Sequence, residues 1–291
     1  MKKINIALII IMILSNIVIA QNKPAYLLYN NKGKKVKYTK MVKRLAKSDM
    51  IFFGEYHTNP ISHWLQFELA KSLHEIKGDS LYFGAEMFEN GNQLVLNEYL
   101  AGFYPEKKML AEITQLWGNY QTDYKPLVEF AKKNKLRFIA TNIPRRYASM
   151  IYKHGMEAFD MMSPDAKAMI GPLQKYYDAS VYEDMKANMG GHIPPTMDNI
   201  QLSQASKDAT MAMFSVESFN KGNLLLHIDG SYHSNNGRGI VWWVNKIKPG
   251  LNIKTITTLT MSEWDEMTKE EKKNIADYII VVADDMTQTK R

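Results

Sequence analysis

The sequence predicts an α/β protein whose mainly parallel sheet is covered by helices and carries an inserted helical cap subdomain. Short, continuous apolar runs, typical of strands buried on both faces, recur along the chain. Helical patterns separate these runs, as they do in repeating strand–helix units. The interval 143–220 breaks this rhythm because it has no good strand and carries several Gly and Pro pairs. These three features together predict the fold class.

The first 20 residues have the pattern of a secretory signal peptide. Two lysines precede an apolar run at residues 6–14, and Val18 and Ala20 are small enough for a signal-peptidase site. The run is short for a membrane span, and polar residues follow it at once. We therefore expect cleavage after Ala20, a mature domain of residues 21–291, and a periplasmic or secreted protein. The alternative is an uncleaved N-terminal anchor.

The composition excludes several classes of site. The chain has no cysteine, so it has no lipid-attachment cysteine, disulfide, thiolate metal site or cysteine nucleophile. Its net charge of +7 suits acidic partners such as carboxylates or phosphates, but the charges are dispersed. We therefore expect no nucleic-acid partner. Many of the 19 methionines fall between Met150 and Met213, where they form either an adaptable pocket wall or a helical core.

The first elements can be placed in order. Residues 50–53 form a short apolar run that ends at Gly54, which predicts a buried strand and a turn. Asn59 and Pro60 predict the N-cap and first residue of a helix, and Gly78 predicts its end. Further strands are expected at residues 81–85 and 137–141, with helical patterns between them.

The second half begins with the cap, expected at about residues 145–205. A long helix follows Pro195, to about Asn220, with Gly222 expected as its C′ residue. The remaining predicted elements are a strand at 223–228, a helix at 239–247, and strands at 253–259 and 278–283.

Polar residues gather where the predicted strands end. Ligands of open parallel sheets bind outside the carboxyl ends of the strands, so these residues are expected to share one site. In strand order they are Glu55 and His57; Glu86; Asn142, Arg145 and Arg146; and His227, Asp229 and His233.

Four of these residues are candidates for catalysis or for binding a divalent metal. Glu55 and His57 share one side of an extended segment, which suits joint metal binding or a carboxylate that orients an imidazole. The alternative is a surface turn. Glu86 lies inside an apolar run, so it is either buried with a partner or functional. His233 follows a second Gly-x-x-His pattern like that of His57.

For His227 and Arg145 the sequence allows both a functional and a purely structural interpretation. His227 lies within a predicted strand and is either a ligand or a hydrogen-bonded core histidine. Arg145 either binds a carboxylate bidentately or is an exposed helix-start residue. His63 and His74 lie on a predicted helix and are expected to be solvated.

The sequence has no Gly-x-Ser-x-Gly, P-loop, Gly-x-Gly-x-x-Gly or His-Glu-x-x-His motif, which disfavours the corresponding enzyme classes.

The same residues carry a family likeness. Six short motifs occur in order along the chain: Gly54-Glu55-Tyr56-His57, Ala85-Glu86-Met87-Phe88, Trp117-Gly-Asn-Tyr120 to Pro126-Leu127, Asn142-Ile-Pro-Arg145, Lys207-Asp208-Ala-Thr-Met211-Ala212 and His227-Ile-Asp-Gly230-Ser-Tyr-His233. Together, over roughly residues 35–260, they resemble the ChaN-like haem-binding uptake proteins, within the superfamily that includes Tiki proteases and erythromycin esterases.

This resemblance implies haem binding in iron acquisition at the cell envelope, with tyrosine ligation of the iron. It also implies a haem-linked homodimer and an outer-membrane haem receptor as partners. The cap tyrosines are the candidate ligands, with Tyr147 first, then Tyr152, Tyr176, Tyr177 and Tyr182. Further expected haem contacts are Asn142, Arg145, His192 and His227. Members of the family are often lipoproteins, and the absence of cysteine here favours a soluble protein instead.

Three functional hypotheses follow. The first is a non-enzymatic haem-binding protein of iron uptake. The second is a hydrolase, an esterase or peptidase, in which Glu55, His57, Glu86 and His233 activate water around a metal or as acid–base groups; the superfamily's enzymes use Glu and His at the matching positions. The third is a binding module with a decayed site.

Overall fold

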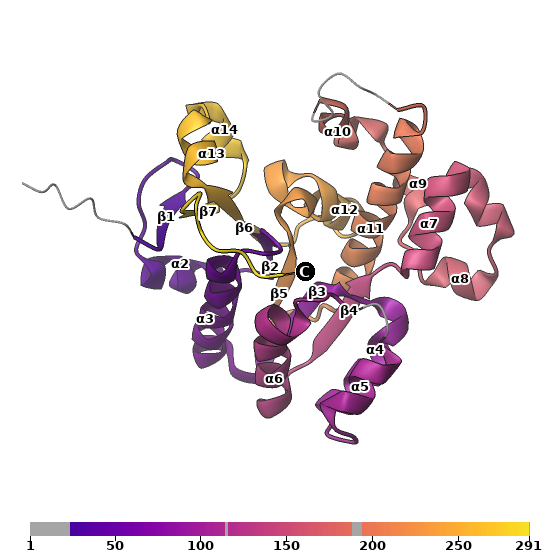
Figure 1. Cartoon of the computed structure of the whole chain (residues 1–291), viewed down its shortest axis with the longest axis horizontal. Coiled ribbons are helices and arrows are strands. Elements are labelled where there is room, and N and C mark those ends of the chain that lie inside the picture. The colour runs from indigo at the N-terminus through magenta and orange to yellow at the C-terminus, as the bar shows by residue number, and fades with distance from the viewer. Residues whose placement is uncertain (1–23, 114–115, 188–193, 291) are drawn as a thin grey trace, which may run out of the picture.

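A computed structural model describes residues 24–113, 116–187 and 194–290, and its centre is a seven-stranded sheet in the order β1-β7-β6-β2-β5-β3-β4 (Figure 1). All neighbouring strands run parallel except β1 and β7, which pair antiparallel. The predicted mainly parallel sheet is therefore confirmed. The strands are β1 (Tyr26–Asn30), β2 (Met50–Glu55), β3 (Leu81–Glu89), β4 (Phe138–Asn142), β5 (Leu224–Gly230), β6 (Ile253–Thr260) and β7 (Tyr278–Val282).

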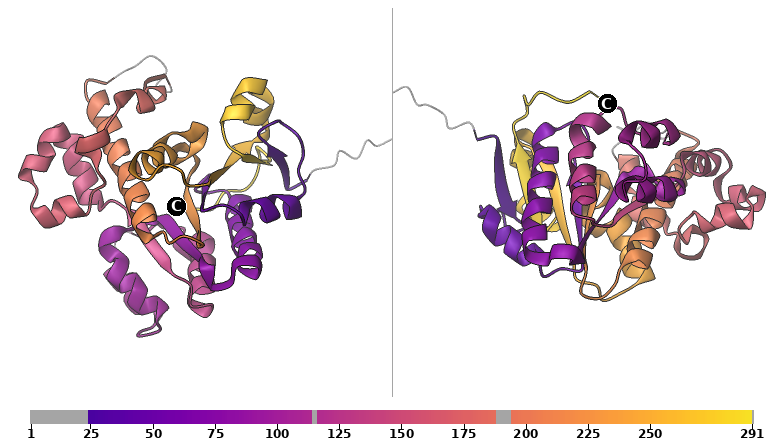
Figure 2. Two further views of the ribbon diagram at one scale, coloured as in Figure 1. Left: turned by 180° about the vertical axis from the view of Figure 1, so that it is seen from behind. Right: turned by 90° about the horizontal axis from the view of Figure 1, so that it is seen from below.

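The two central strands explain why the apolar runs are continuous. Every residue of β2 and of β5 is buried, because each strand has neighbours on both edges and helices on both faces. Figure 2 shows helices on either side of the sheet. Two large hydrophobic clusters, one for each face, consequently form the core.

One face is covered by helices from the first half of the chain, and the other by helices from the second half. The first group is α2 (Tyr38–Leu45), α3 (Pro60–Lys77), α4 (Gln93–Leu100), α5 (Glu106–Glu112) and α6 (Lys125–Lys133). The second includes α7 (Arg145–His154), α11 (Met197–Ser218) and α12 (Gly239–Ile247). A smaller cluster packs α13 (Met261–Glu266), and Ile275 and Ala276 directly after α14 (Lys269–Asn274), beside β6 and β7.

Capping residues in the sequence predicted the ends of α3 and α12 correctly and the end of α11 incorrectly. The side chain of Asn59 accepts a hydrogen bond from the backbone N–H of Ser62, and α3 ends at Lys77 with Gly78, whose φ is +53°, as its C-cap. Helix α12 has the expected bounds. Helix α11, however, ends at Ser218 and passes directly into the extended residue Phe219. Gly222, with φ of +95°, instead lies in the turn before β5, so its assignment as the C′ residue was wrong.

Between β4 and β5 the described chain consists of helices and turns without a strand. Short helices α8 (Pro164–Ala168), α9 (Leu173–Tyr176) and α10 (Asp184–Ala187) lie between α7 and the long α11. Helix α11 contacts both β4 and α12, so it covers the sheet directly. The limits of about 145–205 for a cap remain a prediction. No helix in the described ranges is long and apolar enough to cross a membrane, and the expected signal peptide lies outside those ranges.

Candidate functional site

Glu55 is the last residue of β2 and is held in a dense hydrogen-bond network. It is 1% exposed, and its Oε1 lies 3.0 Å from Nδ1 of His57 and accepts a 2.5 Å hydrogen bond from the Tyr124 hydroxyl. Gln66 donates to the other oxygen. Burial raises the pKa of Glu55, but the charge of His63 and hydrogen bonds from both histidines outweigh it and lower the pKa to about 2.

His63 lies beneath Glu55 and His57 and is buried, although we expected it to be solvated. It is 5% exposed, because it lies on the inward face of α3 together with Gln66. Its Nδ1 lies 3.3 Å from Oε2 of Glu55, and its Nε2 lies 3.4 Å from Oδ2 of Asp123. Burial lowers the pKa of His63, but the two carboxylates raise it to about 9. The expectation of a solvated His63 was therefore wrong. Gln66 and Ala70 lie three and seven positions later on the same buried side of α3, and this helical spacing could have indicated that His63 is buried.

Glu86 and His233 form a second carboxylate–histidine pair. Glu86 is 7% exposed; its Oε2 accepts a 2.8 Å hydrogen bond from Gly230 N–H, and its Oε1 lies 3.4 Å from Nε2 of His233. The other ring nitrogen of His233 pairs with Asp208, which also accepts a hydrogen bond from the Tyr182 hydroxyl at 2.9 Å. Burial opposes a charged imidazole, but the two carboxylates raise the pKa of His233 well above its usual value.

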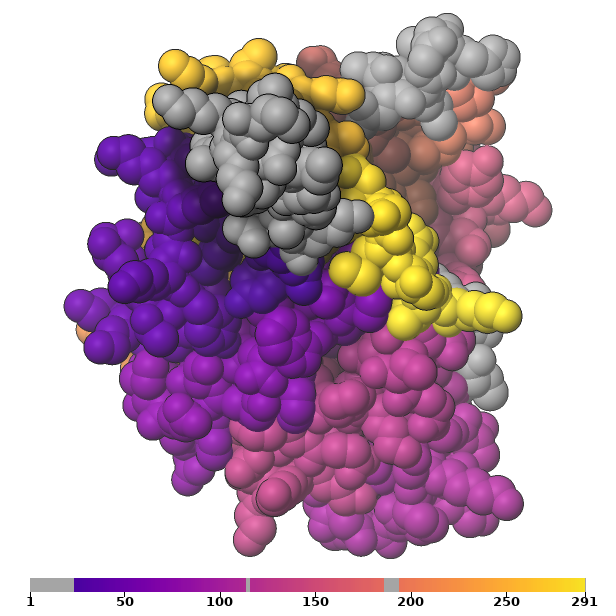
Figure 3. Space-filling view, turned by 60° about the vertical axis from the view of Figure 1, so that its left-hand side comes forward, coloured from indigo at the N-terminus to yellow at the C-terminus, as the bar shows by residue number. Residues whose placement is uncertain are grey.

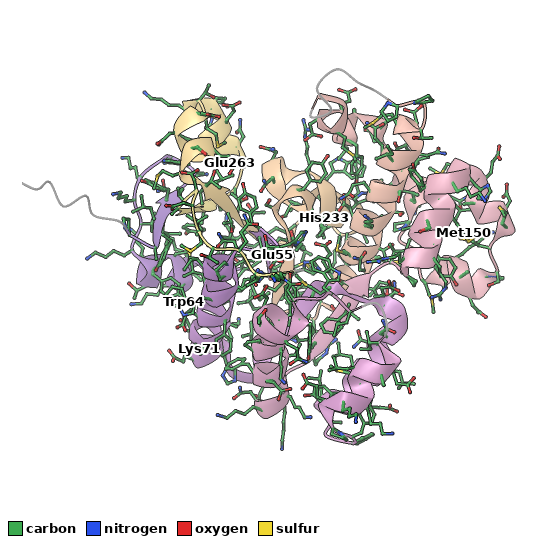
Figure 4. All side chains as sticks on the ribbon, viewed as in Figure 1. Glu55, Trp64, Lys71, Met150, His233 and Glu263 are labelled. Carbon is green, nitrogen blue, oxygen red and sulfur yellow. The ribbon has the colours of Figure 1, made fainter. Side chains whose placement is uncertain are left out.

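The two pairs meet at Gly230. A Cβ atom on this glycine would lie 2.6 Å from Cε1 of His57 and 3.5 Å from Oε2 of Glu86. Figure 4 shows Glu55 and His233 near the centre of the molecule, at the carboxyl edge of the sheet. A cavity of about 650 Å³ opens here, and its lining includes Glu55, His57, Gly230 and His233. The four candidates for catalysis therefore lie together, with Glu86 joined to the others through Gly230 and His233.

His227 is separate from both pairs. It is fully buried inside β5, its Nδ1 lies 3.0 Å from Asp229 Oδ1, and its Nε2 lies 2.9 Å from the hydroxyl of Thr141. Its ring packs against Phe52 and close to Gly84. Both nitrogens are satisfied by these partners and the ring is fully buried among the described residues, so we remove His227 from the residues expected to contact haem. His227 is therefore a hydrogen-bonded core histidine and not a ligand.

A second cavity of about 280 Å³ lies on the other side of Glu86. Helix α7 contributes Arg145, Ala148, Ser149 and Tyr152 to its lining, at the spacing of one helix face. Asn142 also lines it and donates a 2.9 Å hydrogen bond to the carbonyl of Glu86. The remaining lining residues are Met87, Glu89, Trp117, Ile143, Ser203 and Lys207.

Tyr147, the first candidate for the iron ligand, does not line this cavity. Its ring packs against the buried cluster of that half of the molecule, and the guanidinium carbon of Arg146 lies 4.5 Å from the ring centroid. Tyr152, by contrast, lies at the cavity and is 46% exposed. Tyr182 is buried against Asp208, so its hydroxyl is already engaged.

Two other predicted features have no support here. His192 lies outside the described residues. Within the described ranges, no group of three or more His, Asp or Glu side chains has the geometry of a metal site. Glu55 and Glu86 instead use their oxygens to hold tyrosine, glutamine, histidine and backbone donors. The divalent metal proposed for Glu55, His57, Glu86 and His233 is therefore unsupported.

Comparison with solved structures gives consistent matches over most of the chain. ChaN of Campylobacter jejuni, a protein with cofacial haem binding, has a TM-score of 0.69 at 18% identity, covering 88% of this chain and 96% of that one. The erythromycin esterase EreC in its open conformation has a TM-score of 0.52 at 10% identity, covering 92% and 98%. A Bacillus cereus protein has a TM-score of 0.51 at 10% identity, covering 84% and 90%. At these identities the likeness establishes the fold.

No curated protein sequence matches the chain. The family model described as "Haem-binding uptake, Tiki superfamily, ChaN" matches residues 41–244, which is most of the chain and includes both Glu–His pairs, α7 and α11. The chain therefore belongs to the ChaN family of haem-binding uptake proteins in the Tiki superfamily.

Proposed function

We propose that this protein binds haem for iron uptake at the cell envelope, on the surface around the smaller cavity, with the Tyr152 hydroxyl as the iron ligand. The observation that carries the proposal is the position of Tyr152. It is a half-exposed phenol at the rim of a cavity, with Trp117 and Met87 nearby to contact an apolar ring. Tyrosine is an established axial ligand of haem iron.

The charges of the cavity fit one orientation of haem. Arg145 and Lys207 lie on the side formed by α7 and α11 and would pair with the propionates. Glu86 and Glu89 lie on the side formed by β3, where carboxylates would be repelled. A volume of about 280 Å³ is below the usual range for ligand pockets, so most of the macrocycle would lie outside the cavity. A second copy of the chain covering that exposed face would account for a haem-linked dimer.

Haemin titration of residues 21–291 tests this proposal, with the Soret band and the elution volume recorded at each step. We expect a saturable high-spin spectrum, and Tyr152→Phe should weaken binding by at least tenfold and remove the tyrosinate signature. Tyr147→Phe is the matched control, because it makes the same change on the same helix away from the cavity. A spectrum that stays that of free haemin would refute haem binding. Equal binding by both variants would refute Tyr152 as the ligand.

Export of the protein is part of the same proposal. The sequence pattern of residues 1–20 supports a periplasmic or secreted location, where an uptake protein would meet haem. Expression with the native N-terminus, followed by N-terminal sequencing of the purified protein, tests it. A mature protein beginning at Gln21 is expected, and an intact Met1 in a membrane fraction would favour the uncleaved anchor.

A second candidate function is hydrolysis at the larger cavity, and one contrast between the two histidines favours it. His57 uses Nδ1 to contact Glu55, and its side chain remains 28% exposed, so its Nε2 would accept a proton from water. His233 contacts carboxylates through both ring nitrogens and is therefore suited to remain a cation that stabilises negative charge. His57→Gln should abolish any ester or peptide hydrolysis while leaving haem affinity unchanged.

A further inference from the structure

The segment after β7, residues 283–290, contributes several residues to the lining of the larger cavity. It has no regular secondary structure, and every third residue, Ala283, Met286 and Thr289, is half-buried while the residues between them are exposed. Figure 3 shows this segment lying over the surface of the protein. The periodic burial means that one side of an extended strap faces the body of the molecule.

The strap is fixed at both ends. Near its start, Oδ1 of Asp284 accepts hydrogen bonds from the backbone N–H of Ser262 at 3.0 Å and from the Ser262 hydroxyl at 2.5 Å. Near its end, Thr289 N–H donates to the carbonyl of Thr58 at 2.8 Å, and the Thr58 hydroxyl donates to Gln288 at 3.0 Å. Thr58 directly follows His57 in the chain, so this second anchor lies beside the larger cavity.

One further contact connects the strap to the buried network. The Thr289 hydroxyl donates a 2.6 Å hydrogen bond to Oδ2 of Asp123, which is only 7% exposed. The same oxygen accepts a 2.6 Å bond from Asn119 and lies 3.4 Å from Nε2 of His63. Since His63 contacts Glu55, the end of the strap is two side chains away from the carboxylate that holds His57.

Between its anchors the strap forms one wall of the cavity. Ala283, Asp284, Met286 and Gln288 line it together with His57. We propose that residues 283–290 are a lid over the Glu55–His57 pair, latched by Thr289 on Asp123, which lifts when a ligand reaches His57. The strap is held by only a few hydrogen bonds and contributes none to the strand pairing of the sheet, so the latch opens without unfolding the sheet. This lid belongs to the larger cavity, so it is independent of haem binding at Tyr152.

The test measures how fast His57 reacts with diethyl pyrocarbonate, by mass spectrometry of the modified peptide, with His74 on α3 as the internal reference. Thr289→Val removes the hydroxyl that contacts Asp123 and keeps the shape of the side chain. We expect it to raise the rate at His57 at least threefold relative to His74. Thr287→Val is the matched control, because Thr287 is exposed and does not line the cavity; its rate should equal that of the wild type.

A second variant makes the test decisive. Deletion of residues 284–291 leaves β7 intact and removes the strap, so it should raise the rate at His57 at least as much as Thr289→Val. Circular dichroism confirms the fold of each variant, and haemin affinity should stay that of the wild type. If the folded deletion variant reacts at the wild-type rate, the strap does not cover His57 and the lid is refuted. If the deletion raises the rate at His57 and Thr289→Val does not, the strap is a lid, but the proposal that Thr289 latches it is overturned.

Discussion

Nδ1 of His63 lies 3.3 Å from Oε2 of Glu55, and both side chains are buried. On its other side, His63 lies 3.4 Å from Asp123. A charged imidazole therefore holds two carboxylates in place beneath the larger cavity. This arrangement makes the stability of the protein depend on the protonation of one histidine.

His63→Gln should destabilise the protein by about 3 kcal/mol near pH 6, because two buried carboxylates lose their cationic partner. The pKa of His63 is raised from 6.5 to about 9. Stabilisation by the charged imidazole is therefore complete below pH 6.5 and is lost as the pH rises through about 9. Urea denaturation at pH 6, 8 and 10 should show the difference from wild type shrinking with pH. A difference that stays constant or grows would contradict a charged His63, and His74→Gln is the control.

His227→Ala should destabilise the protein without affecting haem. The substitution leaves a cavity inside β5 and removes hydrogen bonds to Thr141 and Asp229, so a loss of about 2–4 kcal/mol is expected. Haemin affinity should be unchanged in the folded protein, because His227 lines neither cavity at the carboxyl edge. Weaker haem binding by a fully folded variant would return His227 to the haem site.

Gln93→Ala should increase self-association. Strand β4 is an edge strand, and the Gln93 side chain donates to the carbonyl of Phe138 at 2.9 Å and accepts from the N–H of Ala140 at 2.7 Å. It therefore occupies backbone groups that another strand would otherwise pair with. Light scattering at rising protein concentration should detect larger species for Gln93→Ala. Gln93→Glu is the control, since a charge at the edge opposes pairing, and equal behaviour of all three proteins would refute this role.

Gly230→Ala should displace His57. The φ of Gly230 is −64°, so alanine fits the backbone, but its Cβ would lie 2.6 Å from the imidazole. The ring must turn away and lose its 3.0 Å contact with Glu55, while the sheet stays intact. NMR of the imidazole nitrogens should show a changed environment for His57, with His227 unchanged as the internal control. An unaltered His57 signal would mean that the ring does not pack on Gly230.

Much of the fold could be predicted from local pattern. The apolar runs at residues 50–53 and 223–228 gave β2 and β5 within two residues at their ends, and Asn59-Pro60 gave the start of α3. Strand β1 was missed, although residues 26–29 are a short apolar run. It is a half-buried edge strand, and its place in the sheet depends on antiparallel pairing with β7 at the far end of the chain.

Part of the candidate site could likewise be predicted from sequence, and part could not. Polar residues at the predicted strand ends could be found from sequence, and Glu55, His57, Glu86 and His233 do lie together at the carboxyl edge. Glu86, however, lies inside β3, which continues to Glu89 instead of ending at residue 85. The direction in which each side chain points could not be predicted from sequence. Tyr147 and Tyr152 lie on one helix, and only the packing of α7 decides that Tyr152 reaches the cavity.

By itself, then, the sequence determined the class of fold, six of the seven strands of the sheet and the chemistry available at their ends, because hydrophobic periodicity and capping depend on neighbouring residues. Tertiary structure alone decided that His63 is buried between Glu55 and Asp123, that His227 is a core residue, and that Thr289 reaches Asp123 across 166 positions of the chain. These contacts depend on strand order and helix rotation. Both are set by the packing of the whole core, which no short stretch of sequence specifies.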